Sequence, residues 1–338
     1  QSYFYPAVGL TWLINETFQL PAVINFAKVR GSYTYVGNEV PFNRINPQHT
    51  INAGGGVNRN TQTPFTDLKP ELITSKEVGL DMRFFLGRLG FDFTYYHITS
   101  NDQFLSLPAP SGSGYTTYFV NAGEIINKGI ELTLTARPVA TSGLQWNTAF
   151  NFSKNTNDVV EIHPDLGAIN MGVSEKVAIR FVEGGSMGDL YTSAFLRDDQ
   201  GKIIVTDEGA PRRMTTMELM GNVEPDWSLG WNNNLTFGNF TVNLLINSKM
   251  GGVVVSQTEA MLDGYGVSKR TGDARDAGGL AVDAVTEEGT AVSTVDPETW
   301  FLQTGGRNGI MEWYVYDRTN IRLSQLALSY TLNLRESG

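Results

Sequence analysis

Apolar and polar residues alternate one by one along several long stretches of this chain. Leu80, Met82 and Phe84 alternate with Asp81 and Arg83, and the same alternation resumes after the pair Gly87-Arg88. A two-residue period predicts β-strands, and a short connection that contains glycine predicts a hairpin between them. A water-soluble hairpin alternates in the same way, so this stretch alone does not distinguish a soluble sheet from a membrane sheet.

The same pattern predicts nine long strands. We expect them at residues 2–13, 22–36, 73–86, 89–101, 119–136, 144–157, 225–237, 239–251 and 313–334. The connections at 14–21, 87–88, 137–143 and 238 are short, and those at 37–72, 102–118, 158–224 and 252–312 are long. Regular alternation of short and long connections is typical of outer-membrane β-barrels, whose periplasmic turns are short and whose outer loops are long.

Each predicted strand has one apolar and one polar face. The apolar face is aliphatic at mid-strand and often aromatic near the ends, as in Leu144, Trp146, Thr148, Phe150 and Phe152. An arginine that faces lipid at mid-bilayer costs roughly 2–4 kcal/mol. We therefore expect the charged residues of the opposite parity to face the lumen of a barrel: Asp81, Arg83, Asp92 and Glu131.

Two places depart from the alternation. Asn233 falls on the apolar face of its strand. In the last strand Leu326 and Leu328 share one parity, whereas Ile321 and Leu323 share the other. Either a β-bulge near Ser324-Gln325 or an upper strand end that stands clear of the bilayer would reconcile the two parities.

Composition supports an all-β membrane protein and excludes several functions. Charged residues make up 18% of the 338 positions, fewer than in most soluble domains, and the chain contains 36 glycines and 37 aromatic residues. No apolar run is long enough for a transmembrane helix. The net charge of −10 argues against nucleic-acid binding, and the absence of cysteine excludes disulfides and thiolate metal sites.

Several stretches together resemble one family. "LKPELITSKEVGLDMRFF" (68–85), "TYYHITSNDQF" (94–104) and "NAGEIINKGIELTL" (121–134) resemble the SusC/RagA class of TonB-dependent outer-membrane transporters of Bacteroidetes. Three further stretches are similar to later strands of its barrel: "YFYPAVGLTW" (3–12), "AKVRGSYTYVGN" (27–38) and "NIRLSQLALSYTL" (320–332). The matches follow the family's order over most of the chain, and together they are specific.

The resemblance implies a 22-stranded barrel with an N-terminal plug, located in the outer membrane of a Gram-negative bacterium. It implies import of a glycan or peptide, driven through the TonB complex, with a SusD-like surface lipoprotein as partner. Neither a plug nor a TonB-contacting segment is visible here, and nine strands are an odd number. We therefore expect residues 1–338 to be a C-terminal portion of one barrel domain, trimmed at both ends.

The candidate solute path consists of lumen-facing and loop residues. Its lumenal members are Arg30, Asp81, Arg83, Asp92, Tyr96 and Glu131, and its loop members are Tyr115 and Tyr118, which could stack on sugar rings. The alternative for the lumenal group is cross-strand pairing that fixes strand register. For the loop aromatics the alternative is a place in the aromatic girdle or in a packed loop.

Catalysis and metal binding have weaker support. His97 and Ser100 could form the base and nucleophile of a barrel phospholipase, but a histidine at the membrane rim is more often an interfacial polar residue, so we expect no enzyme. Asp198 and Asp199 precede Gly201 and are the candidates for a structural calcium ion in the outer loops. Asp-rich turns without metal are commoner, and we expect no other cofactor.

The sequence thus predicts an antiparallel transmembrane β-barrel that acts in transport and contacts outer-membrane lipid. The competing interpretation is a secreted, soluble β-rich module that binds glycans or mediates adhesion. The two differ in the apolar face, which a soluble sandwich buries against a second sheet and a barrel exposes as a band about 25 Å tall.

Overall fold

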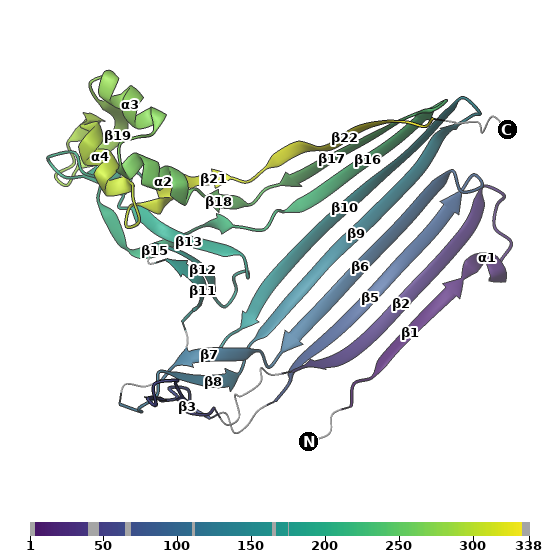
Figure 1. The fold of residues 1–338 in the computed structure, drawn as a ribbon, viewed down its shortest axis with the longest axis horizontal. Helices are drawn as coiled ribbons and strands as arrows, with labels where there is room; N and C mark the ends of the chain where they lie inside the picture. Colours follow the sequence, from purple (N-terminus) through teal and green to yellow (C-terminus); the bar gives the residue numbers. More distant parts are fainter. Residues whose placement is uncertain are drawn as a thin grey trace.

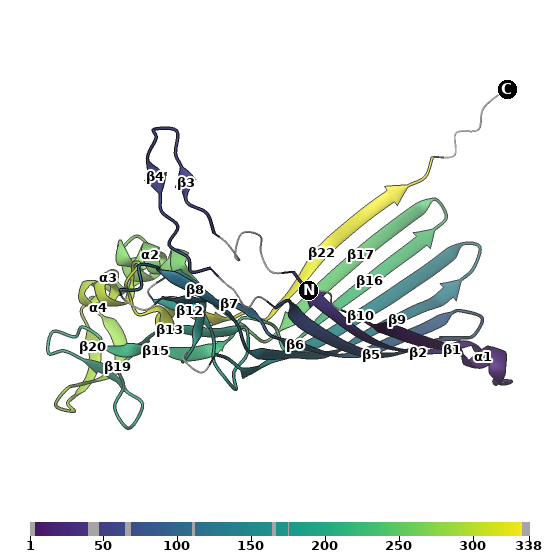
Figure 2. The ribbon, with the colours of Figure 1, turned by 90° about the horizontal axis from the view of Figure 1, so that it is seen from below.

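Nine long antiparallel strands form one curved sheet, which we call the wall. The computed structural model describes residues 4–39, 47–64, 69–109, 112–163, 167–174 and 176–332. The wall strands, in sheet order, are β1 (Ala7–Leu13), β2 (Ile24–Asn38), β5 (Glu71–Phe84), β6 (Leu89–Asn101), β9 (Glu124–Ala140), β10 (Leu144–Glu161), β16 (Trp227–Phe237), β17 (Phe240–Met250) and β22 (Asn320–Tyr330). Figure 1 shows them side by side in chain order, and Figure 2 shows that the sheet curves. All nine predicted strands are confirmed.

Two predicted strands have different bounds in the structure. Residues 119–121 belong to a separate hairpin of β7 (Phe104–Pro108) and β8 (Thr117–Asn121), and Gly123, at φ 91°, separates this hairpin from β9. The predicted strand at 313–334 contains the 3₁₀ turn η1 (Met311–Tyr314) and β21 (Val315–Asp317) before β22 begins. The predicted strand ends at 2–3 and 333–334 lie outside the described residues.

The connections confirm the predicted alternation of short and long. Short turns join β5 to β6, β9 to β10 and β16 to β17 at one end of the wall, and α1 (Ile14–Thr17) lies in the connection between β1 and β2 at the same end. The opposite end carries the long segments, including the small hairpin of β3 (Thr50–Ile51) and β4 (Val57–Asn58). In an outer-membrane barrel, the end of the wall that carries the long loops is the outer end.

The last two long loops fold together into a compact outer subdomain, comprising residues 167–226 and 251–319 apart from position 175. Its strands are β11 (Ile169–Ser174), β12 (Val177–Phe181), β13 (Asp189–Phe195), β14 (Ile203–Val205), β15 (Arg213–Asn222), β18 (Val253–Val255), β19 (Leu280–Thr286), β20 (Ala291–Val295) and β21. Its helices are α2 (Gln257–Gly264), α3 (Lys269–Asp276) and α4 (Pro297–Thr304). A core around the fully buried Trp300 and Tyr314 holds it together. The two long connections predicted at 158–224 and 252–312 therefore contain regular strands and helices.

Pairing in the subdomain is both local and long-range. The stretch 197–205 forms a tight hairpin, in which the N–H of Asp198 donates to the carbonyl of Lys202 over 2.9 Å. The hairpin strand β14 then pairs in parallel with β19, eighty residues further along the chain. Such long-range pairing turns two polar loops into one folded unit.

The β22 bulge accounts for the change of parity in the last strand. Leu245 of β17 pairs with Gln325, whereas its neighbour Ile246 pairs with Leu323, so Ser324 is the extra residue. Its hydroxyl accepts a hydrogen bond from the side-chain amide of Asn247 over 2.7 Å. The bulge keeps Ile321 and Leu323 on the same face of the wall as the later leucines, as one of the two sequence alternatives predicted.

The side-chain amide of Asn233 has a hydrogen-bond partner for its oxygen within the apolar face. It is 3% exposed, and its side-chain oxygen accepts a hydrogen bond from the indole N–H of Trp146 over 3.0 Å. Asn233 therefore provides the hydrogen-bond acceptor for the indole N–H of the neighbouring Trp146 on this apolar face.

Candidate functional site

The charged lumenal residues of the wall pair with one another on β2, β5 and β6. Arg30 donates two hydrogen bonds to the carboxylate of Asp92, over 3.1 and 3.0 Å, and lies 3.8 Å from Glu77. Lys28 lies 3.1 Å from Asp81. Bidentate arginine–carboxylate contacts of this kind fix geometry as well as charge. Arg30, Asp81 and Asp92 thus form the cross-strand pairs that the alternative predicted, and their contact with a solute stays a prediction.

The remaining predicted path residues occupy four different places. Arg83 lies over the ring of Phe26, 5.2 Å from its centroid, and Tyr96 donates to Asn155 over 3.0 Å. Tyr115 and Tyr118 belong to the β7–β8 hairpin, past the outer ends of β6 and β9 (Figure 1). Glu131 lines a hollow of the wall. Their role in solute contact stays a prediction.

Hollows also lie on the lumenal face of the wall. They are formed mainly by β9, β10, β16 and β17, whereas the paired charges lie on β2, β5 and β6. The upper hollow, of about 580 Å³, lies between the wall and the outer subdomain. The middle hollow, of about 590 Å³, lies along the wall, and a smaller one of about 270 Å³ lies near the short turns. Ser153, Ser228 and Lys249 line both the upper and the middle hollow, so these two hollows adjoin each other.

We call the residues that line these three hollows from the lumenal parity the inner track. Its side chains are mostly amides and hydroxyls, with few charges. The polar members are Glu131, Thr133, Thr135, Arg137, Asn147, Asn151, Ser153, Asn155, Asn157, Ser228, Asn232, Asn234, Asn247, Lys249 and Arg322. Such a surface offers both hydrogen-bond donors and acceptors to a solute.

Most of the inner track was not predicted from the sequence, because the predicted path was based mainly on charged residues. The available signal was the set of asparagines at lumenal parity in "WNTAFNFSKNTND" (146–158) and "WNNNL" (231–235). Charged residues on the lumenal face of a barrel wall are the obvious candidates for solute contact. Here most of the charged residues on β2, β5 and β6 form ion pairs with one another. The uncharged polar side chains are the ones that line open space.

The upper hollow is bounded by a firm junction between wall and subdomain. The side-chain oxygen of Asn157 accepts hydrogen bonds from the hydroxyl of Ser186, over 2.5 Å, and from the N–H of Met187, over 2.6 Å. Backbone hydrogen bonds join Val159 to Gly184 and Gly185, each over 2.9 Å. Residues 184–187 thereby tie the subdomain to the outer end of β10.

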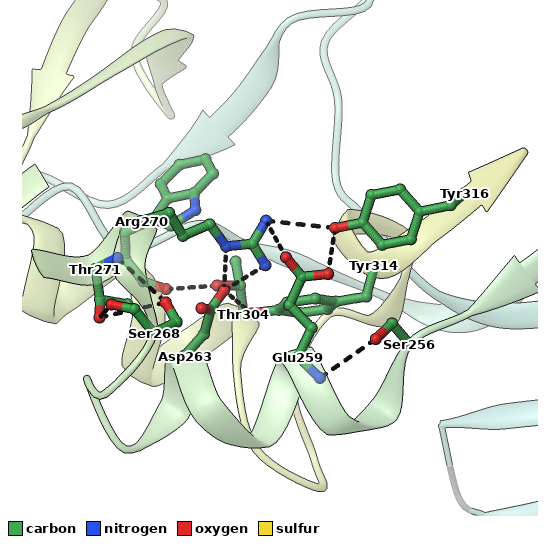
Figure 3. Close-up of polar contacts among 10 residues, drawn as sticks. Ser256, Glu259, Asp263, Ser268, Arg270, Thr271, Thr304, Tyr314 and Tyr316 are labelled. Atoms are coloured by element: carbon green, nitrogen blue, oxygen red, sulfur yellow. Dashed lines mark hydrogen bonds and ion pairs between the residues drawn. The ribbon is translucent and has the colours of Figure 1, made fainter. Parts of the chain in front are cut away.

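A buried polar cluster holds the helices of the subdomain together (Figure 3). Asp263, 1% exposed, accepts hydrogen bonds from Arg270, over 2.6 Å from Nε, and from the hydroxyl of Tyr314, over 3.1 Å. Glu259 accepts a hydrogen bond from Tyr316 over 2.6 Å and lies 3.4 Å from Arg270. The cluster therefore links α2 and α3 to the segment that leads into β22.

Burial and pairing shift the pKa values in this cluster. Burial raises the pKa of Tyr314 well above its usual range, because the charged phenolate would be poorly solvated there. Burial also raises the pKa of Tyr316, and its hydrogen bond to Glu259 acts in the same direction. Burial lowers the pKa of Arg270, but the hydrogen bond with Asp263 and the negative charges of Asp263 and Glu259 together outweigh that effect, and the net pKa is raised. The cluster is structural and contacts none of the hollows of the wall.

His97 and Ser100 do not form a catalytic pair. They are three residues apart on one strand, so their side chains lie on opposite faces of the sheet. His97 pairs in register with Lys76 and Lys128 on the lipid-facing parity. The geometry gives the histidine no serine nucleophile on its own strand.

Asp198 caps a turn. Its carboxylate accepts hydrogen bonds from the backbone N–H groups of Gln200, over 2.9 Å, and Lys202, over 2.8 Å. Within the described ranges, no three acidic, histidine or cysteine side chains gather as a metal site would require. Calcium at Asp198 and Asp199 stays a prediction.

The fold and its faces define a class. An antiparallel wall exposes an apolar face that no second layer covers, with Val78 57%, Leu10 75% and Leu328 71% exposed, and its opposite face is polar. None of the helices in the described part of the chain has the length and apolarity of a membrane crossing. This is the wall of an outer-membrane β-barrel, and the soluble two-layer alternative is wrong.

Comparisons with known proteins identify the family. The family described as "TonB dependent receptor-like, beta-barrel" matches residues 1–268, and this chain belongs to it. TonB-dependent receptor P3 of Formosa agariphila is 28% identical over 97% of this chain and 35% of its own length. TonB-dependent receptor SusC of Bacteroides thetaiotaomicron is 24% identical over 59% of this chain and 22% of its own length.

A solved structure shows the same fold. The structure described as the RagAB peptide importer in the closed-closed state aligns with a TM-score of 0.71 at 16% identity, over 96% of this chain and 36% of that chain. The resemblance to SusC and RagA is thus confirmed, as is the location in the outer membrane of a Gram-negative bacterium. This chain spans about a third of the length of the first of these relatives. The family consists of receptors and transporters.

Proposed function

We propose that this chain forms part of the wall and outer loops of a TonB-dependent importer of a glycan or peptide nutrient. The inner track carries the proposal, because it provides a continuous polar surface from the outer subdomain along the lumenal face of the wall. The family supports energised import, and a relative of the same fold is described as a peptide importer. We further propose a SusD-like surface lipoprotein and the TonB complex as partners, and no catalytic activity.

The boundary shared by the upper and middle hollows offers the sharpest test. Ser153 and Ser228 line both hollows, with their hydroxyl oxygens 2.7 Å apart. In the full-length receptor, Ser153→Trp should place a bulky indole at this boundary and lower the maximal rate of nutrient uptake by cells at unchanged receptor level. The matched control is Phe152→Trp, one residue away on the lipid-facing parity, and it should leave uptake unchanged.

The assay measures growth and labelled-nutrient uptake on oligosaccharide and oligopeptide mixtures, with and without the TonB energy complex. Uptake that persists without that complex would contradict the proposal of energised import. Equal uptake by the Ser153→Trp and Phe152→Trp receptors would show that the inner track is not the solute route.

A further inference from the structure

The lipid-facing side of the wall carries a cluster of basic residues at the outer edge of its apolar band. Lys76 of β5 pairs in register with His97 of β6, which pairs with Lys128 of β9. Lys154 of β10 pairs with Ile130 and therefore lies diagonally next to Lys128. We call Lys76, His97, Lys128 and Lys154 the basic row.

The parity of the strands places the basic row toward lipid. On β5, Lys76 has the parity of Val78, Leu80, Met82 and Phe84, and the same relation holds for the other members on their own strands. The three lysines are exposed and His97 is half-buried. None of them faces the lumen, so the solute route does not explain them.

The height of the row matches a bilayer boundary. Phe84 and Lys76 are eight residues apart, which is about 27 Å along a strand and, at the usual tilt of barrel strands, about 20 Å across the membrane. The apolar band of such walls is about 25 Å tall. The next lipid-facing row below contains Val78 and Tyr95, of which Tyr95 is 42% exposed, as an interfacial aromatic belt requires.

Among the residues that the structure describes, one member of the row has an ion-pair partner. Lys128 lies 2.8 Å from Asp158, on the outer side of the row. Within the described residues, no carboxylate forms an ion pair with Lys76 or Lys154, and like charges in neighbouring cross-strand positions repel each other. An anionic group from outside would remove this repulsion.

We propose that the basic row binds the phosphorylated headgroup of a lipid in the outer leaflet, with the acyl chains against the apolar rows below. Phosphate groups suit the site because they are multivalent anions at the depth where the lysine ammonium groups emerge from the apolar band. The apolar rows that continue downward from the basic row favour a lipid over a soluble phosphate. This inference needs only the membrane orientation of the wall and does not depend on the transported solute.

The test uses the full-length receptor, purified in a non-ionic detergent and titrated with bisphosphorylated lipid A, with native mass spectrometry as readout. The triple variant Lys76→Gln, Lys128→Gln, Lys154→Gln should weaken binding roughly 100-fold, because each lysine near an anionic lipid contributes about five-fold. Lys154→Gln alone should weaken it about five-fold. The matched control is Lys249→Gln, which removes one charge at a similar height from the lumenal face and should leave lipid binding unchanged.

Two further measurements keep the test decisive. Dephosphorylated lipid A should bind the unmodified receptor as weakly as bisphosphorylated lipid A binds the triple variant. Inorganic phosphate at the same phosphate concentration should not displace the lipid. Equal binding of dephosphorylated lipid A, displacement by inorganic phosphate, or an equal effect of Lys249→Gln would each overturn the proposal. If the triple variant fails to fold, the Lys154→Gln and Lys249→Gln pair decides.

Discussion

At the scale of single residues, two side chains of the wall depend on glycines opposite them. A Cβ on Gly129 would lie 2.5 Å from the carbonyl oxygen of Lys154 and would also meet the hydroxyl of Tyr96. A Cβ on Gly79 would lie 2.5 Å from Nε of Arg30. These glycines make room for the tyrosine and the arginine to lie flat across the neighbouring strand.

The Gly129→Ala variant should destabilise the full-length receptor by about 1–3 kcal/mol, because a backbone oxygen cannot move aside as a side chain can. The matched control is Gly31→Ala, whose Cβ would meet nothing closer than the carbonyl oxygen of Glu77 at 3.8 Å. Urea unfolding in detergent, followed by tryptophan fluorescence, measures both. A Gly129→Ala receptor as stable as Gly31→Ala would contradict the crowding argument.

At the scale of elements, the bulge in β22 decides which face of the strand meets lipid. Deleting Ser324 and Gln325 together turns Ile321 and Leu323 to the lumenal face and Arg322 toward lipid, because a one-residue shift exchanges the two faces of a strand. We expect this double deletion to be lost from the outer membrane in a fractionation assay. Deletion of Ser324 alone removes only the extra residue of the bulge and should assemble. Ser324→Ala keeps the residue count and should assemble normally, with only the hydrogen bond from Asn247 removed.

The Tyr314 hydroxyl makes the packing of α2 against η1 sensitive to alkaline pH. Because burial raises the pKa of Tyr314 above its unfolded value of 10.0, its stabilising contribution is complete below pH 10 and is lost as the pH rises further. Proteolysis of the outer subdomain in the full-length receptor should therefore accelerate between pH 10 and 11.

The Tyr314→Phe variant should be cleaved faster at pH 8, since it loses a hydrogen bond worth about 1 kcal/mol, but its rate should rise less steeply with pH. Part of the alkaline rise should remain, because burial also raises the pKa of Tyr316. Tyr265→Phe, at a side chain that is 74% exposed, is the control and should match the unmodified receptor at every pH. An unchanged alkaline slope in Tyr314→Phe would contradict the assignment.

At the scale of the whole molecule, the two faces of the wall should differ in access to water. This chain has no cysteine, so single cysteines report one position each once any cysteines elsewhere in the receptor are replaced. A water-soluble maleimide should label Thr133→Cys, on the inner track, and spare Leu132→Cys, on the apolar face. The reverse order of labelling would invert the assignment of lumen and lipid.

The wall was predictable because its signal is local. Alternation of single residues is visible within each strand, and even the bulge near Ser324 follows from a change of parity over a few positions. The outer subdomain was not predictable, because its strands are short and pair across long separations, as Ile203 does with Ala284. The inner track was missed for a chemical reason, since asparagines such as Asn151 carry no charge to mark them.

The outer subdomain is built from two loops that are separate in the sequence, and this has a consequence for how such receptors diversify. Ser193, from the earlier loop, donates to the carbonyl of Gly309 and accepts from the N–H of Met311, both in the later loop. An exchange of one loop alone with a relative would break this mutual fit, so new specificities should arise where both loops are inherited together. Chimeric receptors intended to take up a different nutrient should therefore carry the two loops as a matched pair.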